Sequence, residues 1–298
     1  MLFPKKQVYP ILTPQICFRD KYANLNAYVE MNPSMNIDEM GNVIILVRCV
    51  NYRKFFDRQF TMYENHSYSH YYIFRGAIQN DGQPLDIDNY SIEHLKHEYS
   101  RQTYATYWKG IEDIRFIDSE NVLTIVPECN PGGNPSIFWA KLDGSMLHSF
   151  VDCRPNIVEK NWMPFNKNKV IYSLEPFVVK DILDDNQTTI DVSEENKQLL
   201  KGYHGSTNGV QYNDKYLLFL IHLNKDKVYH KWMLFNPDTC EVKLSSEFIF
   251  FRHAYIEFTC SLCKYNERMF ISVGVNDDKA YIIETDCSTI NNFIGCID

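Results

Sequence analysis

The sequence predicts an all-β fold, and more narrowly a five-bladed β-propeller. Short apolar runs of strand length recur along the whole chain, and Asn, Asp, Gly or Pro bounds each of them. Aromatic residues, which favour strands, make up 14% of the chain. A repeat of about 50 residues then narrows the all-β class to a propeller.

The expected strands are the runs NVIILVRCV, YYIFRGAI, NVLTIVPE, PSIFWAKL, KVIYSLEPFVV, YLLFLIH, HKWMLFN, EFIFF, RMFISVGV and AYIIET. Helical periodicity is weak, and its best examples are residues 87–102 and 193–202. We predict a short helix in the second segment, with Ser193 as its N-cap and Gly202 just beyond its end. Neither segment suits the crossover helix of a parallel sheet.

The repeat consists of a small or polar signature, a short strand, a tight turn and a strongly apolar strand. Asp113, Trp162, Gly209 and Cys260 occupy equivalent points in four copies, which lie 49, 47 and 51 residues apart. A fifth copy, residues 31–52, precedes them by about one period once an insertion at about residues 53–107 is allowed for. We therefore expect residues 1–298 to form a single five-bladed propeller domain.

Net charge, cysteine content and the length of apolar runs limit the binding partners and the cellular compartment that we expect for the protein. The formal net charge of −8 argues against nucleic acid or an anionic membrane as a partner. Nine scattered cysteines fit a reducing cytosol, and Cys260 and Cys263 read as buried strand residues rather than as a metal site. No run of 18 apolar residues and no leader-like segment is present, so we expect a cytoplasmic protein.

In a propeller the innermost strands line one channel, so equivalent positions of different blades converge there. Polar side chains at these positions are candidates for a site. From blade one to blade five they are Arg48, Asn51 and Tyr52; Asp113 and Arg115; Lys160, Asn161 and Trp162; Ser206 and His222; Glu257 and Asp277.

Their chemistry suits a sugar and an anion. Asp113 could act as a general acid or orient a sugar hydroxyl. The cationic group, Arg48, Arg115, Lys160 and His222, could hold a phosphate. Trp162 could stack on a sugar ring, and the remaining residues could bond its hydroxyls. Structural roles remain open for each, including inter-blade ion pairs made by Glu112 and Arg115 and core packing of aromatic rings.

Four phrases resemble glycoside hydrolase family 130 and the related glycosyltransferase family 108. They are EDIR at 112–115, KNWMPF at 160–165, the GST turn at 205–207 followed by a strand that ends at His222, and GVND at 274–277. The resemblance runs from about residue 40 to 285 as short phrases. It implies a five-bladed propeller and an activity on β-mannosides.

The resemblance also implies a mechanism with one catalytic carboxylate. Asp113 matches the aspartate that acts as general acid while phosphate attacks the anomeric carbon with inversion. Arg115, Lys160 and His222 match basic residues of the motifs, and Asp277 matches an aspartate near the sugar. No cofactor and no metal are implied, but inorganic phosphate or a sugar phosphate would be a co-substrate. Ile221 and Leu223 flank His222 where the family has Tyr and Gly.

We therefore expect an enzyme that transfers or phosphorolyses a mannose-like unit with inversion. Two alternatives stay open. A hydrolase on the same scaffold needs a second carboxylate as base, and Glu257 or Asp277 might serve. A non-catalytic glycan-binding propeller predicts that the cations point away from the channel while aromatic rings line it. The expected partners are an oligosaccharide or sugar-phosphate substrate and, as a further option, a second copy of the chain.

Overall fold

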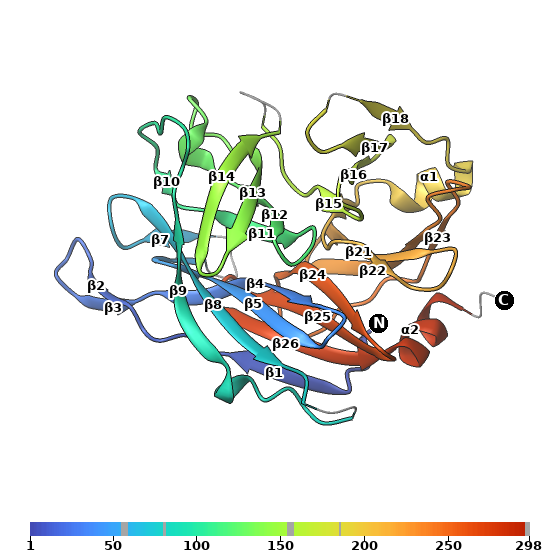
Figure 1. Ribbon diagram of the computed structural model, residues 1–298, viewed down its shortest axis with the longest axis horizontal. Helices are drawn as coiled ribbons and strands as arrows, with labels where there is room; N and C mark the ends of the chain where they lie inside the picture. The colour runs from blue at the N-terminus through green and yellow to red at the C-terminus, as the bar shows by residue number, and fades with distance from the viewer. Residues whose placement is uncertain (55–58, 80–81, 154–157, 185, 296–298) are drawn as a thin grey trace.

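Five four-stranded blades make up the computed structural model, which describes residues 1–54, 59–79, 82–153, 158–184 and 186–295. Figure 1 shows them in chain order, from the blue and cyan strands of blade one to the red strands of blade five. In each blade neighbouring strands run antiparallel, and in blades one to four they follow one another along the chain from the innermost strand outward. The predicted all-β propeller and its five blades are confirmed.

Blades one and two form one continuous sheet. The parallel pair β14–β9 joins them, with Met146 opposite Lys96 and Leu147 opposite His97. Blade one consists of β4 (Val29–Ile37), β5 (Asn42–Val50), β8 (Ser67–Ala77) and β9 (Ser91–His97). Blade two consists of β11 (Glu112–Phe116), β12 (Asn121–Ile125), β13 (Ile137–Asp143) and β14 (Met146–Asp152).

Blades three and four have the shortest inner strands. Blade three consists of β15 (Met163–Pro164), β16 (Lys169–Leu174), β17 (Phe177–Asp181) and β18 (Gln187–Thr189). Blade four consists of β19 (His204–Gly205), β20 (Val210–Gln211), β21 (Leu217–Asn224), β22 (Val228–Phe235) and β23 (Val242–Leu244). Both β19 and β20 pair with β21, so together they occupy the inner position.

Blade five closes the ring with a strand from the other end of the chain. It consists of β24 (Glu257–Tyr265), β25 (Arg268–Val275), β26 (Lys279–Asp286) and β1 (Gln7–Ile11). β1 pairs with β26 along five residues as the outermost strand, where Pro10 can be accommodated because one side of an edge strand needs no donor. This pairing ties the N-terminal segment to the last blade.

Shorter elements lie outside the blades or beside their edges. Figure 1 shows the hairpin of β2 and β3 projecting from the body of the molecule. They are β2 (Cys17–Arg19), β3 (Leu25–Ala27), β6 (Tyr52–Lys54), β7 (Phe60–Met62), β10 (Trp108–Lys109), α1 (Glu194–Leu200), α2 (Cys287–Ile294) and two 3-10 turns at Ile87–Asn89 and Pro127–Cys129. Within the described residues, no helix combines the length and apolar character needed to cross a membrane.

The tight turn of the sequence repeat has one physical basis in four blades. Asp38, Asp118, Asn166 and Asn213 each accept a backbone N–H three or four residues further along, at 2.8 to 3.0 Å. A short Asp or Asn side chain that accepts in this way replaces a backbone hydrogen bond and reverses the chain. The repeat was therefore visible because the first hairpins of these four blades share this turn.

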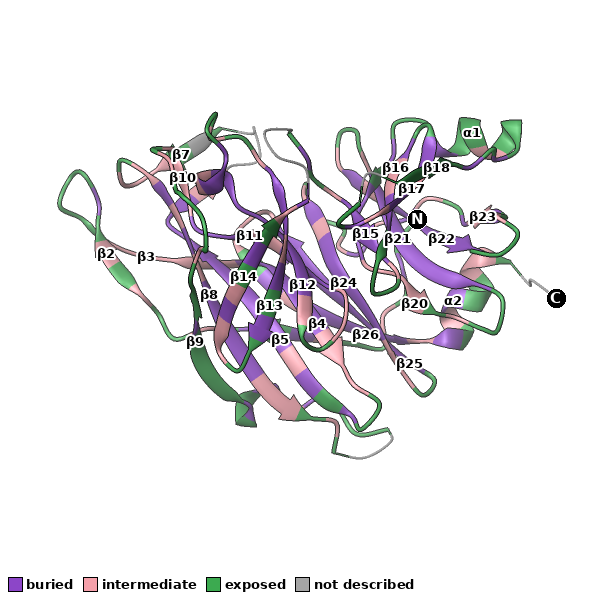
Figure 2. Cartoon of the chain, turned by 45° about the horizontal axis from the view of Figure 1, so that its top comes forward, coloured by how far each residue is buried: buried purple, intermediate pink, exposed green. Residues whose placement is uncertain are grey.

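Five buried apolar clusters fill the spaces between neighbouring blades, one for each of the five interfaces. The cluster between blades four and five includes Trp232 and Ile271, and the cluster between blades five and one includes Phe270 and Val43. The other three join blades one and two, two and three, and three and four. Figure 2 shows the resulting contrast between buried central strands such as β5 and β25 and the exposed outer strand β9. The ring of interfaces, rather than any one sheet, therefore forms the core.

The helix expected in residues 193–202 is confirmed as α1. Ser193 Oγ accepts the backbone N–H of Asn196 at 3.2 Å, and Gly202 follows with a φ of +74°. The other segment with helical periodicity, residues 87–102, instead contains a 3-10 turn followed by strand β9. It pairs with β8 over five residues, because blade one needs a fourth strand and tertiary pairing outweighs a weak local pattern.

The segment at 53–107, expected as an insertion, contributes to blade one. β8 pairs with β5 over nine residues, and β9 pairs with β8 in turn. The outer half of blade one therefore comes from inside this segment. Within this segment, only the residues before β8, between β8 and β9, and after β9 lie outside the four strands of the blade.

Candidate active site

One pocket, with a volume of about 260 Å³, takes its lining from all five blades. It lies where the innermost strands come together, since β4 contacts both β11 and β24. The lining from blade one to blade five is Asn32, Asp113, Lys160, Asn161, His204, His222, Glu257, Phe258 and Asp277, with Lys54, Asn224, Val228 and Ile256 completing it. Six of the twelve residues singled out from the sequence therefore share one pocket.

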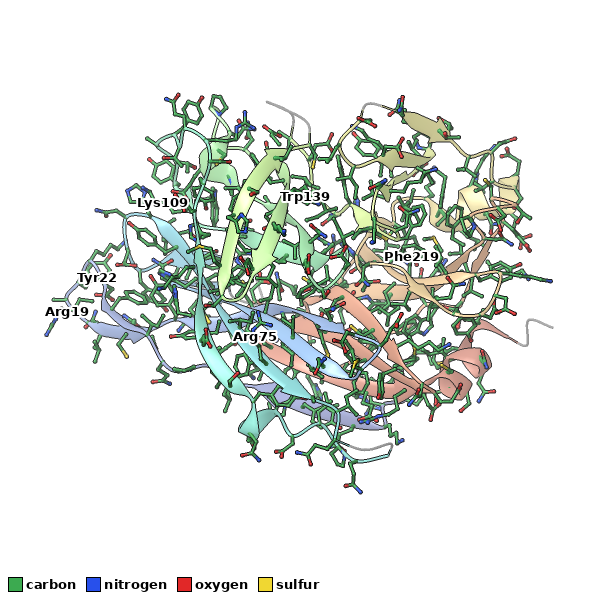
Figure 3. All side chains as sticks on the ribbon, in the orientation of Figure 1. Arg19, Tyr22, Arg75, Lys109, Trp139 and Phe219 are labelled. Carbon is green, nitrogen blue, oxygen red and sulfur yellow. The ribbon has the colours of Figure 1, made fainter. Side chains whose placement is uncertain are left out.

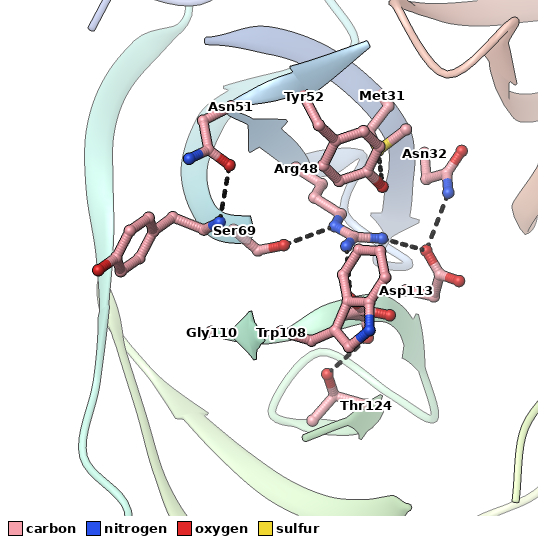
Figure 4. Close-up of polar contacts among 12 residues, drawn as sticks. Met31, Asn32, Arg48, Asn51, Tyr52, Ser69, Trp108, Gly110, Asp113 and Thr124 are labelled. Carbon is pink, nitrogen blue, oxygen red and sulfur yellow. Dashed lines mark hydrogen bonds and ion pairs between the residues drawn. The ribbon is translucent and has the colours of Figure 1, made fainter. Parts of the chain in front are cut away.

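Asp113 is held in place by two donors. Its Oδ1 accepts a hydrogen bond from Asn32 Nδ2 at 2.9 Å and another from Arg48 Nη1 at 3.3 Å (Figure 4). Within the described residues no hydrogen bond reaches Oδ2, and the side chain is 17% exposed. One oxygen thus fixes the carboxylate while the other faces no protein donor.

The backbone at this point is strained in a way typical of functional sites. Asp113 has a φ of +45°, and the β11–β12 register shifts between Glu112 and Arg115. Asn32, its hydrogen-bond partner, has a φ of +41°. Non-glycine residues rarely adopt such angles, and here two of them meet side chain to side chain.

Arg48 binds carboxylates rather than lining the pocket. It is 3% exposed, and its Nη2 donates to Glu112 Oε1 at 2.8 Å while its Nε donates to Ser69 Oγ at 2.8 Å. Burial raises the pKa of Glu112, and the Arg48 charge opposes that shift. The guanidinium therefore neutralises a pair of carboxylates, Glu112 and Asp113, which leaves it unavailable to a phosphate. The inter-blade ion pair expected for Glu112 is present, with Arg48 as its partner.

Arg115 is also buried, and it makes a different inter-blade contact. Its Nε donates to the carbonyl of Ser206 in blade four at 2.6 Å, and its guanidinium lies 5.5 Å from the ring centroid of Phe258. Only 2% of the residue is exposed. It supports the wall of the pocket from behind instead of binding an anion in it.

Besides Lys54, which is paired with Asp277, the basic groups that line the pocket are Lys160, His204 and His222. Burial lowers the pKa of His222 well below its usual range, and nearby positive groups lower it further. Burial and the Lys160 charge also lower the pKa of His204. The two rings lie 5.7 Å apart, and His222 Nδ1 is buried without a hydrogen-bond partner among the described residues. This corner therefore combines one full cation with two neutral imidazoles that can donate N–H groups.

Glu257 and Asp277, the two carboxylates that a hydrolase could use as base, have different bonding partners in the structure. The oxygens of Glu257 accept the backbone N–H groups of Phe250 at 2.8 Å and Phe251 at 2.6 Å, so this side chain supports a loop although it borders the pocket. Asp277 forms an ion pair with Lys54 at 3.3 Å. Of the two, Asp277 is the one whose oxygens face no backbone donor among the described residues.

Four further candidates lie away from the pocket. Trp162 is 1% exposed, with its Nε1 donating to Glu159, so no face of the indole is open to a sugar. Tyr52 is buried against Met31 and Trp108. Asn51 and Ser206 are fully buried and bond the protein itself, at Glu64, His66 and Tyr68 for Asn51 and at Thr259 for Ser206. In all four the core packing or internal hydrogen bonding considered as the alternative is what the structure shows.

Comparison with known proteins gives matches in structure only. No family model and no curated protein matches the sequence. A β-1,2-mannobiose phosphorylase from Listeria innocua matches with a TM-score of 0.60 and 11% identity, over 90% of this chain and 92% of that one. A glycosyl hydrolase from Bacteroides ovatus gives 0.59 and 14%, over 96% and 93%. A GDP-Man-dependent mannosyltransferase from Leishmania mexicana, MPT-1, gives 0.52 and 12%, over 87% and 85%.

The chain has the fold of the mannoside phosphorylases. A further match, with a TM-score of 0.56, comes from work on the GH130 family itself. The resemblance to this family predicted from short phrases is therefore confirmed for the fold. At 11% to 14% identity the matches say nothing about which reaction this chain performs.

The fold brings seven residues to the pocket that the sequence did not single out. They are Asn32, Lys54, His204, Asn224, Val228, Ile256 and Phe258. His204 directly precedes the Gly205 of the GST phrase, and Asn32 lies at the start of the first repeat copy. For Asn32 and His204 only the position within a blade gave a signal, since a single Asn or His outside a recognised motif does not stand out in the sequence.

Gly274, from the GVND phrase, makes room for Asn32. A Cβ at this position would lie 2.2 Å from Asn32 Oδ1 and 2.7 Å from its backbone N, closer than real Cβ contacts come. We expect Gly274→Ala to displace Asn32 and release its hydrogen bond to Asp113. The free energy of unfolding should fall by about 1–3 kcal/mol, measured by urea denaturation.

The matched control is Gly209→Ala in blade four, where the new Cβ would crowd the ring of Phe219 (labelled in Figure 3) at 2.5 Å. It should cost similar stability without touching Asp113. Of the two variants, only Gly274→Ala should also lower the rate of phosphate release from mannose 1-phosphate per folded molecule. Equal activity of the two variants would contradict a role for Asn32 in positioning Asp113.

Proposed function

We propose that the protein is a carbohydrate-active enzyme that transfers a mannose-like unit, with inversion, between a phosphorylated donor and a hydroxyl acceptor. The observation that carries this proposal is the placement of Asp113. It is fixed by Asn32 and Arg48 on one oxygen and shares a five-blade pocket with Lys160 and His222.

The reaction needs one proton transfer and one displacement. In the transfer direction, the acceptor hydroxyl oxygen attacks the anomeric carbon of a sugar 1-phosphate. The bond from that carbon to the phosphate oxygen breaks, phosphate leaves with the electron pair, and the Asp113 carboxylate takes the hydroxyl proton. In the reverse direction phosphate attacks, and Asp113 returns the proton to the departing glycosidic oxygen. A single displacement inverts the anomeric centre and requires only one protein carboxylate.

Basic groups opposite the carboxylate would hold the phosphate. Lys160 supplies the charge, and the imidazoles of His204 and His222 supply N–H donors. Both hydrogen bonds from Asn32 and Arg48 are donated to Oδ1 of Asp113. Oδ2 is therefore the oxygen that would take the proton of the acceptor hydroxyl in the transfer direction.

The alternatives receive less support. The binding-module hypothesis predicts cations turned away and aromatic rings in the channel. Arg48 and Arg115 are indeed turned away and Phe258 lines the pocket, but Lys160 and His222 also line it and Trp162 is buried. A hydrolase needs a free second carboxylate as base, and Glu257 is bonded to two backbone amides while Asp277 is paired with Lys54. The names of the similar structures, a phosphorylase and a mannosyltransferase among them, favour a mannose-like unit.

The test is phosphate release from α-mannose 1-phosphate in the presence of mannose or a β-manno-oligosaccharide as acceptor. We expect release that depends on the acceptor, and a product whose new linkage is β by NMR. Mannose freed from β-mannosides without phosphate would instead establish a hydrolase. No turnover of sugar phosphates or of GDP-mannose, with sugars still raising the melting temperature, would establish a binding module.

A further inference from the structure

The hairpin formed by β2 and β3 carries two exposed apolar side chains away from the body of the molecule. Tyr22 and Leu25 are each 72% exposed. Among the described residues these two strands pair only with each other, and Figure 1 shows the hairpin projecting at one end of the long axis. A hairpin of two strands is only marginally stable by itself, and Tyr is a side chain that often dominates binding at protein interfaces. The hairpin is therefore a candidate for contact with another molecule.

The tip of this hairpin has a fixed shape and two exposed cations. Asp20 is 8% exposed, and its Oδ1 accepts the backbone N–H groups of Tyr22 and Asn24, both at 2.8 Å. A contact surface that is already ordered loses little conformational freedom on binding. Because the Asp20 carboxylate is bonded within the hairpin, the charges that remain exposed at the tip are Arg19 and Lys21 (Figure 3 labels Arg19 and Tyr22).

A mostly apolar groove lies at the opposite end of the molecule. Its volume is about 410 Å³, and it lies between the β16–β17 turn, the residues at and after the end of β18, and α1. Its apolar lining includes Leu174, Phe177, Ile190 and Val192. Figure 1 shows β17, β18 and α1 far from β2 and β3 along the long axis. The hairpin therefore cannot reach the groove of its own chain, but it can reach the groove of a second copy.

The polar rim of this groove is acidic. Glu175 and Asp191 are exposed there. Lys197 also lines the groove, but it pairs with Asp191 at 3.0 Å and with Glu194 at 2.6 Å, so one cation faces three carboxylates. Opposite charges around an apolar contact orient the two partners and speed their encounter. The acidic rim thus matches the two cations at the hairpin tip.

We propose that the β2–β3 hairpin of one copy of the chain docks into this groove of a second copy. Tyr22 and Leu25 enter the apolar groove, and the two cations of the tip face its acidic rim. Because hairpin and groove are different surfaces of the same chain, the contact is heterologous and adds copies head to tail, into a ring or a filament. No residue that lines the candidate active site belongs to either surface, so the contact is independent of the proposed function.

The test is the mass of the protein in solution, measured by size-exclusion chromatography with light scattering at increasing protein concentration. For the wild-type protein we expect a weight-average mass that rises above that of one chain. Tyr22→Ala on the hairpin and Thr189→Arg, which places a bulky cation in the groove, should each weaken association about tenfold or more. Both residues are exposed, so both variants should keep the wild-type melting temperature.

Mixing the two variants separates this contact from any other. Tyr22→Ala keeps an intact groove and Thr189→Arg keeps an intact hairpin, so their mixture should form dimers of one copy of each, with wild-type affinity and no further growth. The control is Tyr107→Ala, which removes a ring that is 70% exposed and lies outside both surfaces, and it should associate like the wild type. A wild-type protein that stays monomeric at every concentration would overturn the proposal, and so would association that survives both variants or a mixture that stays monomeric.

Discussion

Replacing Asp113 by Asn should lower the rate of phosphate release from mannose 1-phosphate by about 10²–10⁴-fold, the contribution typical of general acid–base catalysis. The amide oxygen of the variant can still accept from Asn32 Nδ2 and Arg48 Nη1, so the pocket should keep its shape. It cannot take a proton from the acceptor hydroxyl. The rate should therefore fall while the affinity for sugar changes little, which steady-state kinetics and calorimetry can separate.

A matched control is Asp143→Asn, which removes an exposed carboxylate from the outer part of blade two. It should keep the full rate. If Asp113→Asn retained more than a tenth of the wild-type rate, another group would have to move the proton. Asp277, which also lines the pocket, would then be the next carboxylate to replace.

The fold was accessible from sequence because its repeating unit has a local cause. In four blades the first hairpin has an Asp or Asn that accepts backbone N–H groups at its turn. Second strands such as β5 and β25 are buried on both faces because neighbouring blades cover them on both sides. These features lie within about 20 residues of one another, so a single sequence shows them.

Two strands, β9 and β1, could not be predicted from the sequence, each for a different reason. In β9 only Leu95 is buried, so a strand that pairs on the outside of a blade carries no apolar signature. β1 belongs to blade five, although nearly the whole chain separates it from β26. Nothing local in residues 7–11 specifies such a distant partner.

The site was predicted less well because a one-residue change in register turns a strand side chain from the channel to the blade interface. Asp113 and Arg115 are two residues apart and would share a face in a regular strand, yet only Asp113 lines the pocket. The register shift in β11 and the positive φ of Asp113 separate them. Neither feature has a sequence signal, so Arg115, Arg48 and Trp162 could not be told from pocket residues.

Replacing Arg48 by Met should destabilise the protein by about 3–5 kcal/mol, since it leaves Glu112 and Asp113 together without their cation. The side chains of all three are at most 19% exposed, so water can screen the two negative charges only weakly. Met fills much of the same volume, which keeps the loss of packing small. The double variant Arg48→Met/Glu112→Gln removes one charge again and should recover a large part of the lost stability in urea denaturation.

The stability lost in Arg48→Met should also depend on pH, and it should be larger at higher pH. Burial already raises the pKa of Glu112 in the folded protein, and without Arg48 nothing opposes that shift. Between the unfolded value of about 4.3 and the higher folded value, the folded state then binds more protons than the unfolded one, so stability falls as pH rises. Arg48→Met should therefore be closer to wild type at about pH 4.5 than at about pH 7.5. A deficit that is the same at both pH values, and that Glu112→Gln does not relieve, would instead locate the loss in the Arg48–Ser69 hydrogen bond and the packing of the arginine stem.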